Sequence, residues 1–268
     1  MDFSDSTQPI YIKREGAIGY LLLNRPEKKN AMSEEMWTEI PVALGRLNCD
    51  IQVRVIVLGS SSNGAFSAGA DIAELEVIAA TPARRESNRR AIRSAQRALA
   101  DSPKPTIAQI SGVCLGGGCG LALHCDMRFA TDASRFGITP AKLGIVYPLS
   151  DTKQLMDLVG PAKAKSMLFT GRVMKAGEAL SIGLIDEIHS EENIAEKTAT
   201  FANQIVAVSQ FSVRNMKKVV RRVLDGQADD DEATAEMFKN AQEGEDAAEG
   251  IRAFLEKRPA NFTWNGED

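Results

Sequence analysis

The sequence predicts an α/β fold with a helical C-terminal region. Short apolar and β-branched runs, of which residues 53–58 (VRVIVL) are the clearest, alternate with helical patterns through most of the chain. From about residue 191 onward the pattern is almost wholly helical. Strands that alternate with helices indicate an α/β core, and helices alone indicate an appended region. We therefore expect a core over residues 1–195 and a helical region over residues 196–268.

Local signals predict the individual elements. Residues 10–13 and 18–23 are apolar runs that predict a hairpin. Ser33 is the expected N-cap of the next helix, whose pattern contains Pro41. The other expected elements are a helix of about 20 residues between Thr81-Pro82 and Pro103, a buried strand over residues 106–113, an apolar helical turn over 120–124, a strand over 127–130 and a helix over 150–159.

Composition excludes several classes of protein. The chain has 268 residues, with 32 Lys and Arg against 36 Asp and Glu, and 44% of its residues are hydrophobic. These values exclude a disordered chain, a collagen-like chain and a disulfide-stapled mini-protein. The net charge of -4 argues against a nucleic-acid-binding protein, which would show a basic excess.

The cysteines and the apolar runs indicate a cytoplasmic protein. The four cysteines form no CxxC pair and the chain has only two histidines, so we expect reduced thiols and no metal site. The polar N-terminal segment over residues 1–16 does not resemble a signal peptide. No apolar run reaches the ~18 residues that a membrane span needs.

Two glycine-containing turns each follow a strand and precede a helix. The first covers residues 66–71 (FSAGAD) and the second residues 115–118 (LGGG). Glycine lets the backbone approach a ligand closely, and the start of a helix adds unpaired N–H donors. Two such turns facing each other would direct two N–H groups at one oxygen atom, forming an oxyanion hole. Tight packing alone is the alternative interpretation of either turn.

These turns belong to a set of motifs that resembles the crotonase superfamily, also called the enoyl-CoA hydratase/isomerase family. The resemblance covers nearly the whole chain in the expected order. The motifs that carry it are residues 23–26 (LNRP), 29–32 (KNAM), 65–72 (AFSAGADI), 116–118 (GGG), 125–130 (CDMRFA), 169–171 (FTG), 183–186 (GLID) and 254–258 (FLEKR).

The resemblance implies a ββα spiral core, a C-terminal helical region used for trimerisation, and a homotrimer or a dimer of trimers. It implies a CoA thioester substrate and fatty acid metabolism, with no cofactor besides the coenzyme A that is part of the substrate. By position, the oxyanion hole would consist of the backbone N–H groups of Ala70 and Gly117. The implied CoA-binding residues are Lys29, Ala31, Ala68, Asp71, Ile72, Leu115, Gly116 and, from a neighbouring subunit, Lys257. Asp71 is also the expected cap of the helix after the first turn.

The sequence departs from the family at the positions that carry its acid/base pair. Hydratases of this family use two glutamates, and the matching positions here hold Gly120 and Pro140. A one-residue shift of the second position gives Thr139 or Ala141, neither of which supplies a carboxylate. The two-carboxylate pair that adds water across a double bond is therefore absent from its usual places.

Enolate chemistry that needs no such pair remains open. Loss of CO₂ from a β-carboxyl thioester forms an enolate without a base, and a pocket without carboxylates would not repel a substrate carboxylate. Residues 138–147 (ITPAKLGIVY) resemble the methylmalonyl-CoA decarboxylase branch, although that branch keeps a glutamate where this chain has Gly120. That match implies that Tyr147 lies beside the acyl group, where its hydroxyl orients a carboxylate or relays a proton. Decarboxylase- or isomerase-type chemistry is the resulting hypothesis.

Asp151 is the nearest candidate for a base outside the two usual positions. The interpretation that we favour from sequence is an N-cap, shared with Ser150, for a helix from Thr152 onward. If Asp151 were instead a working base, the chain could be an enoyl-CoA hydratase with a non-standard base. A non-catalytic acyl-CoA-binding protein is the third alternative, because both glutamates are missing.

Other residues receive structural interpretations. The arginines at positions 85, 89, 93 and 97 form one basic helix stripe, which we expect to be a solvated or subunit-contact face rather than a CoA phosphate site. His124 is expected to be a core histidine, and we assign no role to His189 or to Cys119. A serine hydrolase and a nucleotide-binding protein are disfavoured, because the chain has neither GxSxG nor GxxxxGK[ST].

Overall fold

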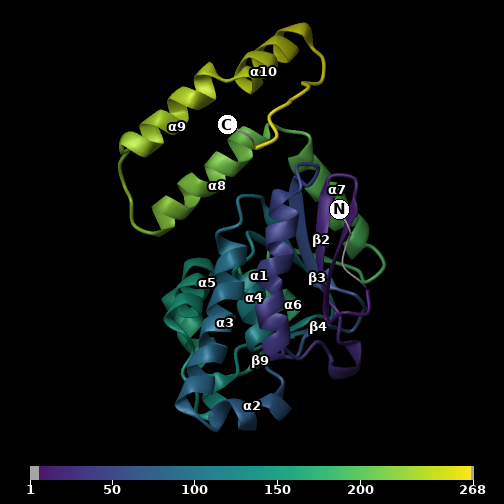
Figure 1. Ribbon diagram of the computed structural model, residues 1–268, viewed down its shortest axis with the longest axis vertical. Coiled ribbons are helices and arrows are strands. Elements are labelled where there is room, and N and C mark those ends of the chain that lie inside the picture. Colours follow the sequence, from purple (N-terminus) through teal and green to yellow (C-terminus); the bar gives the residue numbers. More distant parts are fainter. Residues whose placement is uncertain (1–5, 267–268) are drawn as a thin grey trace.

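The computed structural model describes residues 6–266 (Figure 1). The first five residues, part of the polar N-terminal segment, and the last two residues lie outside the described part. The predicted hairpin is confirmed: β1 (Ile10–Glu15) pairs antiparallel with β2 (Ile18–Leu23). The predicted strand over residues 53–58 is present as β3 (Val55–Ser60).

The other elements follow in chain order. They are the 3₁₀ turn η1 (Pro26–Lys28), α1 (Glu34–Cys49), β4 (Ala65–Ser67), α2 (Ile72–Ala79), α3 (Pro82–Ala100), β5 (Thr106–Ile110), β6 (Val113–Leu115), α4 (Gly117–Leu123), β7 (Met127–Thr131), β8 (Arg135–Gly137), the 3₁₀ turn η2 (Pro140–Leu143), α5 (Leu149–Thr170), β9 (Val173–Lys175), α6 (Ala176–Ser181), β10 (Glu187–His189), α7 (Ile194–Val206), α8 (Gln210–Leu224), α9 (Glu232–Glu243) and α10 (Glu245–Glu256).

Two sheets form the core, and from β3 to β8 successive strands alternate between them. One sheet has the order β1-β2-β3-β5-β7-β10 and the other has the order β4-β6-β8-β9. The pairs β3–β4, β5–β6 and β7–β8 therefore each place their first strand in the larger sheet and their second in the smaller one. Apart from β1–β2 and β8–β9, neighbouring strands run parallel. This arrangement confirms the predicted α/β class.

The prediction of one strand over residues 106–113 is wrong, and Gly112 explains why. The chain leaves the larger sheet after β5, turns at Gly112 and enters the smaller sheet as β6. Gly112 has φ +70°, and a Cβ there would lie 1.9 Å from the Gly64 carbonyl oxygen. Only glycine fits this turn, because another residue would be strained and would clash with the backbone. The break brings the start of α4 to the end of a strand in the smaller sheet.

Helix caps read from the sequence are confirmed at three places. The Ser33 side chain accepts a hydrogen bond from the Met36 N–H, and α1 continues through Pro41. Thr81 caps α3 through the Arg84 N–H. Asp71 caps α2 through the Ala73 N–H. The helix predicted over 150–159 is longer, because α5 includes a kink at Gly160 (φ 72°) and continues to Thr170.

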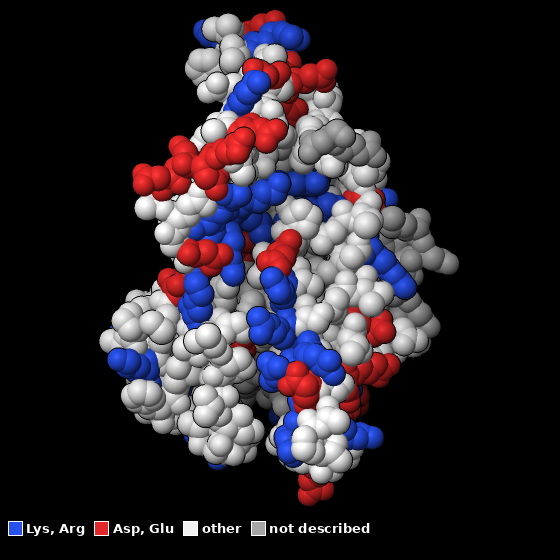
Figure 2. Space-filling model, turned by 60° about the vertical axis from the view of Figure 1, so that its left-hand side comes forward, with Lys and Arg blue, Asp and Glu red and all other residues white. Residues whose placement is uncertain are grey.

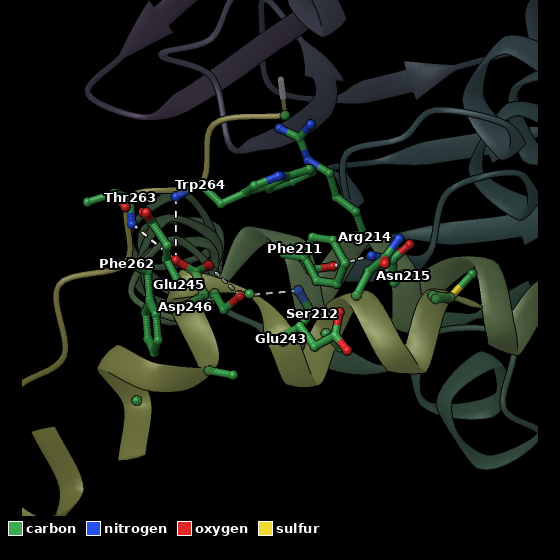
Figure 3. A pocket seen from close by; sticks show the side chains of 18 of the residues that line it. Phe211, Ser212, Arg214, Asn215, Glu243, Glu245, Asp246, Phe262, Thr263 and Trp264 are labelled. Atoms are coloured by element: carbon green, nitrogen blue, oxygen red, sulfur yellow. Dashed lines mark hydrogen bonds between the residues drawn. The ribbon is translucent and has the colours of Figure 1, made fainter. Parts of the chain in front are cut away.

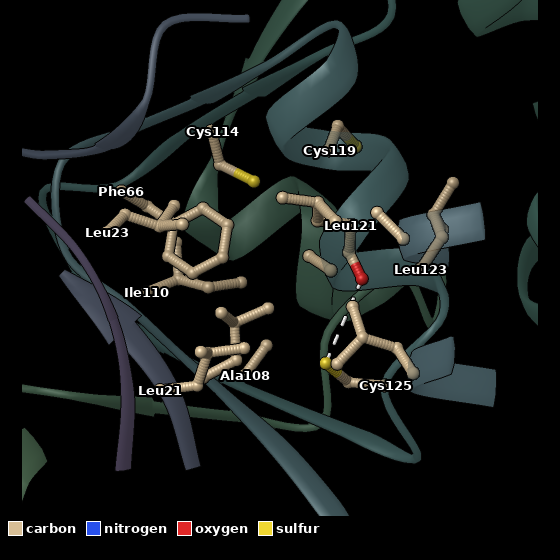
Figure 4. Close-up of a cluster of buried hydrophobic side chains, with 14 of the residues drawn as sticks. Leu21, Leu23, Phe66, Ala108, Ile110, Cys114, Cys119, Leu121, Leu123 and Cys125 are labelled. Atoms are coloured by element: carbon tan, nitrogen blue, oxygen red, sulfur yellow. Dashed lines mark hydrogen bonds between the residues drawn. The ribbon is translucent and has the colours of Figure 1, made fainter. Parts of the chain in front are cut away.

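The buried apolar side chains between the sheets and helices include three of the cysteines. Figure 4 shows Cys114, Cys119 and Cys125 among leucines and Phe66, close to the start of α4. All four cysteines are free thiols. Burial raises the pKa of Cys125 to about 12, which keeps this thiol protonated at neutral pH.

The last three helices form an arm beside the core. Figure 1 shows α8, α9 and α10 extending away from the sheets, whereas α7 packs on the larger sheet through residues such as Ala202. The boundary expected between residues 195 and 196 falls inside α7. Several large apolar side chains of the arm are exposed, among them Val220, Val223, Phe254 and Leu255. No helix within residues 6–266 is long and apolar enough to cross a membrane.

Lys104 is a buried charge that ties the end of α1 to the start of β5. Its side chain is almost fully buried, and Nζ donates to the carbonyl oxygens of Leu47 and Asp50, each at 2.7 Å. Lys104→Met should lower the free energy of unfolding by about 3 kcal/mol, because both carbonyls lose a charged donor. Lys153→Met, which breaks partly exposed pairs with Asp157 and Asp225, should cost about 1 kcal/mol or less. Chemical denaturation of both variants measures the difference.

The same substitution has a distinctive pH dependence. Burial, followed by the charge of Arg214, lowers the pKa of Lys104 from 10.5 to about 8. Between these two values the unfolded chain binds a proton that the folded chain has lost, so this group makes folding more favourable as the pH rises. The stability advantage of the wild type over Lys104→Met should therefore increase from pH 8 to pH 10.5. A constant or shrinking advantage over this range would contradict the buried-charge assignment.

Candidate active site

The first turn is fixed to the segment before α1. The Met32 N–H donates to the Gly69 carbonyl at 2.7 Å, and the Asp71 N–H donates to the Met32 carbonyl at 3.0 Å. These two bonds flank Ala70 on one side, so its own N–H points to the opposite side. Within the described residues the Ala70 nitrogen donates no hydrogen bond. It is available to a ligand.

The second turn leads into α4. The Gly116 N–H donates to the Gly137 carbonyl at 2.8 Å, which fixes the turn to β8. Gly117 is the first residue of α4, and its N–H has no acceptor among the described residues. A free N–H at the first position of a helix is one of the donors that helix geometry leaves unpaired. Gly116 has φ +49°, a conformation that favours glycine.

The structure brings the two turns into direct contact. A Cβ placed on Gly69 would lie 3.0 Å from the Leu115 carbonyl oxygen and 3.7 Å from the Gly116 Cα. Gly69 also has a positive φ, +98°. Ala70 and Gly117 each follow one of these two neighbouring glycines, so their free N–H groups belong to one small region of the backbone.

The segment that carries Lys29 and Ala31 lies against the first turn. The Ala68 N–H donates to the Lys29 carbonyl at 2.9 Å, and Ser67 Oγ donates to the Asn30 carbonyl at 2.7 Å. Three of the predicted CoA-binding positions, Lys29, Ala31 and Ala68, are thus neighbours, and Leu115 and Gly116 adjoin the same place.

The Asp71 side chain is already engaged by the protein. Arg25 Nη2 donates to Asp71 Oδ2 at 3.0 Å, while Arg25 Nη1 donates to the Ala31 carbonyl at 2.8 Å. Burial by itself would raise the pKa of Asp71, but the hydrogen bonds from Arg25 and the Ala73 N–H outweigh it and lower the pKa. The carboxylate therefore stays ionised and holds the turn in place. Ile72, the next residue, is exposed.

Lys257 lies elsewhere in the chain. It follows α10 in the arm, whereas α2 lies at the opposite end of the molecule (Figure 1). One chain alone cannot bring Lys257 to the two turns. Its predicted contact with CoA depends on a neighbouring subunit, as the family resemblance implies.

Position 120 is surrounded by polar groups, although it is glycine itself. A Cβ placed on Gly120 would lie 2.7 Å from Gln96 Nε2, 3.1 Å from Asp151 Oδ2 and 3.3 Å from Tyr147 Oη. These side chains come from α3, from the start of α5 and from the segment before α5. The space into which a side chain at position 120 would extend is therefore occupied by the Asp151 carboxyl group and its neighbours.

Asp151 is not an N-cap, and this corrects the interpretation favoured from the sequence. Helix α5 begins at Leu149 after Pro148, so Asp151 lies within its first turn. The carboxyl group is buried, accepts from Gln96 Nε2 at 2.9 Å through Oδ2, and accepts from Ser150 Oγ at 3.2 Å through Oδ1. Burial raises the pKa of Asp151, and the charge of His124 and the hydrogen bonds from Gln96 and Ser150 oppose the rise.

Tyr147 presents an unused hydroxyl to the same region. Its Oη is buried and approaches the Asp151 carboxyl group, but it makes no hydrogen bond of full geometry within the described residues. Burial, then the negative charge of Asp151, raises the pKa of Tyr147 well above its usual value, so the hydroxyl keeps its proton. A buried hydroxyl without a partner is uncommon and marks a place where a ligand can supply one.

His124 approaches Asp151 from the other side. Its Nδ1 lies 2.7 Å from the Gly120 carbonyl oxygen, and its Nε2 lies 3.9 Å from Asp151 Oδ1. Both side chains are buried, at 4% and 3% exposure. The predicted core position of His124 is confirmed. The sequence did not indicate its approach to Asp151, nor the participation of Gln96, which faces inward from the arginine-rich α3.

The arginine stripe on α3 is solvent-exposed. Arg89 and Arg97 pair with Glu86 and Asp101 on the same helix. Figure 2 shows Lys and Arg side chains gathered along this face of the molecule. In the single chain the arginine stripe therefore forms a solvated face, as expected from the sequence.

A separate cavity of about 1210 Å³ lies in the arm (Figure 3). Its lining includes Phe211, Arg214, Asp246 and Trp264. Asp246 there already accepts hydrogen bonds from Ser209 Oγ and from backbone N–H groups of the C-terminal segment. The cavity contains neither glycine turn, so it is not the candidate active site. Among residues 6–266 no three His, Cys, Asp or Glu side chains are grouped as a metal site requires.

Comparison with known proteins identifies the family. The sequence model described as Enoyl-CoA hydratase/isomerase matches residues 13–265. A crotonyl-CoA hydratase of Syntrophomonas wolfei is 35% identical over 256 residues, covering 94% of this chain and 97% of that protein. A short-chain-enoyl-CoA hydratase of Clostridium acetobutylicum is 32% identical over 255 residues, covering 93% of this chain and 95% of that protein.

The solved structures agree with the sequence relatives. An enoyl-CoA hydratase/isomerase family protein from Hyphomonas neptunium superimposes with a TM-score of 0.95 at 42% identity, covering 97% of this chain and 100% of that one. An enoyl-CoA hydratase from Bacillus anthracis gives a TM-score of 0.87 at 30% identity, covering 97% of this chain and 100% of that one. The chain therefore belongs to the enoyl-CoA hydratase/isomerase family.

Proposed function

We propose that this protein is an enzyme that moves a proton between carbon atoms of an acyl-CoA thioester, shifting a double bond, with Asp151 as its single acid/base. The observation that carries the proposal is the position of the Asp151 carboxyl group, 3.1 Å from the point where a side chain at residue 120 would begin. Residue 120 is where the hydratases of the family have a glutamate. A carboxyl group thus reaches this region from α5 instead of from α4.

The two glycine turns supply the other half of the chemistry. The free N–H groups of Ala70 and Gly117 would donate to the thioester carbonyl oxygen and stabilise the enolate that forms when a proton leaves the neighbouring carbon. The CoA portion would lie against Lys29, Ala31, Ala68, Ile72, Leu115 and Gly116, with Lys257 contributed by a neighbouring subunit.

One carboxyl group is sufficient for isomerisation. The carboxylate of Asp151 would take a proton from the carbon beside the thioester carbonyl of a 3-enoyl-CoA, and the electron pair of that C–H bond would pass to the carbonyl oxygen, giving a dienolate. Protonated Asp151 would then return the proton to the carbon at the far end of the dienolate. The electron pair on oxygen would re-form the C=O bond as the double bond moves next to the carbonyl. Hydration usually uses two carboxylates, and position 140 supplies none because it is proline. The raised pKa of Asp151 suits this role, since a general base works best with a pKa nearer the operating pH. Tyr147 would orient the acyl group through its unpaired hydroxyl.

Hydration is the second candidate, because curated relatives carry hydratase names. It would require Asp151 to activate water without a second carboxylate. The hypothesis of decarboxylation rested partly on a site without carboxylates. Asp151 lies beside Gly120, so this part of the reasoning no longer holds. A non-catalytic acyl-CoA-binding protein has no need of a buried carboxyl group beside Gly120, three residues after Gly117.

The proposal includes an oligomeric state, a homotrimer or a dimer of trimers, and a cytoplasmic location. The exposed apolar side chains of the arm fit the trimerisation role that the family resemblance implies, as a homotrimer or a dimer of trimers. The free thiols are compatible with a cytoplasmic protein. Light scattering of the purified protein would measure the oligomeric state.

A panel of CoA thioesters tests the proposed reaction. The purified enzyme would be incubated with a 3-enoyl-CoA, a 2-enoyl-CoA and methylmalonyl-CoA, and the products identified by mass spectrometry and NMR. We expect interconversion of the 2- and 3-enoyl isomers. Addition of water as the fastest reaction would support hydration, CO₂ release would support decarboxylation, and binding without turnover would support the non-catalytic alternative.

A carboxylate exchange between residues 120 and 151 tests the structural basis. Gly120→Glu alone should reduce isomerisation at least about 10²-fold, because the new side chain meets Gln96 and Asp151 and removes Asp151 from its position. In the double variant Gly120→Glu with Asp151→Gly, the carboxyl group returns to α4 and the contact with residue 151 is relieved, while the contact with Gln96 remains. We expect the double variant to be more active than Gly120→Glu. Equal or lower activity of the double variant would contradict the idea that the two positions supply the same group.

A further inference from the structure

We propose that His124 is a positioning residue that controls the protonation of Asp151, the two side chains forming a buried pair that takes up one proton between them. This inference rests on the proposed function for its consequences in catalysis. Its physical basis is the contact itself, which holds whatever reaction the protein catalyses.

The hydrogen bonds of the two side chains fix which atoms face each other. A carbonyl oxygen can only accept, so the 2.7 Å contact to the Gly120 carbonyl places a proton on His124 Nδ1. Neutral His124 therefore directs the lone pair of Nε2 toward Asp151 Oδ1, 3.9 Å away. Asp151 Oδ2 is held by Gln96 Nε2 at 2.9 Å, whereas Oδ1, which accepts from Ser150 Oγ at 3.2 Å, is the oxygen that faces the imidazole.

The surroundings isolate the pair from water. Both side chains are buried, and the elements around them bring few other charges. Arg221 on α8 opposes protonation of His124, and Asp101 after α3 favours it more weakly than Asp151 does. Tyr147 faces Asp151 with a neutral hydroxyl, and beyond it lie the thiols of Cys114 and Cys119. Burial is the largest influence on both groups, since it lowers the pKa of His124 and raises the pKa of Asp151. Among the charges around the pair, each member is the largest influence on the other.

The pairing has a consequence for the base. When the pH falls, a proton can enter on His124 Nε2 and leave Asp151 as a carboxylate. The carboxylate would then remain able to accept a substrate proton at a lower pH than it could without the imidazole. Without His124, the incoming proton must bind to Asp151 itself, and the base is lost.

Two substitutions at position 124 separate this role from simple packing. His124→Asn keeps a donor at the place of Nδ1 and removes the group that faces Asp151. His124→Gln places its amide nitrogen near the position of Nε2, where it can donate to Oδ1 but cannot titrate. We expect the acid-side midpoint of the kcat profile to rise by about 1 pH unit or more in His124→Asn and by less in His124→Gln. Unchanged midpoints in both variants, with lower thermal stability alone, would overturn the proposal.

A second measurement does not depend on turnover. The chain has only two histidines, so their imidazole ¹⁵N signals can be followed directly through a pH titration. In Asp151→Asn the titration midpoint of His124 should fall, because the carboxylate that favours its charged form is gone. His189 is the internal control, since its partner is Glu187 at 2.7 Å. A His124 midpoint that does not respond to Asp151→Asn would overturn the pairing, whereas a fall without turnover of any thioester would leave the pairing intact and contradict the proposed function.

Discussion

Asp151→Asn should lower kcat for the double-bond shift by about 10²–10⁴-fold, the usual contribution of a positioned general base. The amide has nearly the shape of the carboxyl group but cannot accept and return a proton. The Kd for a CoA thioester should stay within a few-fold of the wild type, because the proposed CoA contacts lie in the two turns and the segment before α1. Stopped-flow or coupled assays with a 3-enoyl-CoA, together with calorimetric binding, measure both quantities.

Asp157→Asn provides the matched control for this substitution. Asp157 lies on the same helix, α5, and forms a partly exposed pair with Lys153. Its replacement should leave kcat unchanged. If Asp151→Asn kept more than about a third of wild-type activity, Asp151 could not be the base, because loss of a general base costs far more than this.

Stability should change in the opposite direction to activity. The pKa of Asp151 is raised in the folded protein, so its ionisation opposes folding as the pH rises above the usual value of 3.8. Asparagine removes this cost. At neutral pH, Asp151→Asn should therefore unfold at the same temperature as the wild type or at a higher one, as expected where a functional site retains a group that destabilises the fold.

Gly117→Pro should lower kcat by about 10²–10³-fold relative to Gly117→Ala, because only proline removes the backbone N–H that would donate to the thioester oxygen. Proline suits the first position of a helix, where the N–H has no helical partner. Both variants add a Cβ that would lie 3.0 Å from Trp37 Cζ2, so the comparison with alanine cancels the effect of this crowding. Thermal unfolding of the two variants checks that the proline chain is folded.

Similar kcat values for Gly117→Pro and Gly117→Ala would contradict the oxyanion hole. A loss of binding with no change in kcat would also contradict it, because transition-state stabilisation should appear mainly in kcat. The free N–H groups of Ala70 and Gly117 would then be a consequence of packing at two tight turns.

The features that depend on residues close together in the sequence could be predicted from the sequence. Ser33, Asp71 and Thr81 were recognisable as helix caps because a cap forms with residues two or three positions away. The two glycine turns were recognisable for the same reason. The change of sheet at Gly112 was not, since it depends on how closely the Gly64 carbonyl approaches from another loop.

The residues around position 120 required the tertiary structure. Gln96 and Asp151 are 55 residues apart in the sequence, and nothing in either helix predicts that they meet. The sequence shows that the two positions of the family's glutamates, Gly120 and Pro140, carry no carboxylate. The sequence does not show that a carboxyl group from α5 occupies the space beside Gly120, because that depends on the packing of α3, α4 and α5.

Exchange of substrate hydrogen for deuterium tests the central claim most directly. A CoA thioester would be incubated in D₂O with the wild type, Asp151→Asn and Asp157→Asn, and the deuterium at each acyl carbon followed by NMR. If Asp151 is the acid/base, the wild type and Asp157→Asn should incorporate deuterium beside the carbonyl at equal rates, and Asp151→Asn should be slower by about 10²-fold or more. Equal incorporation by Asp151→Asn would show that another group moves the proton.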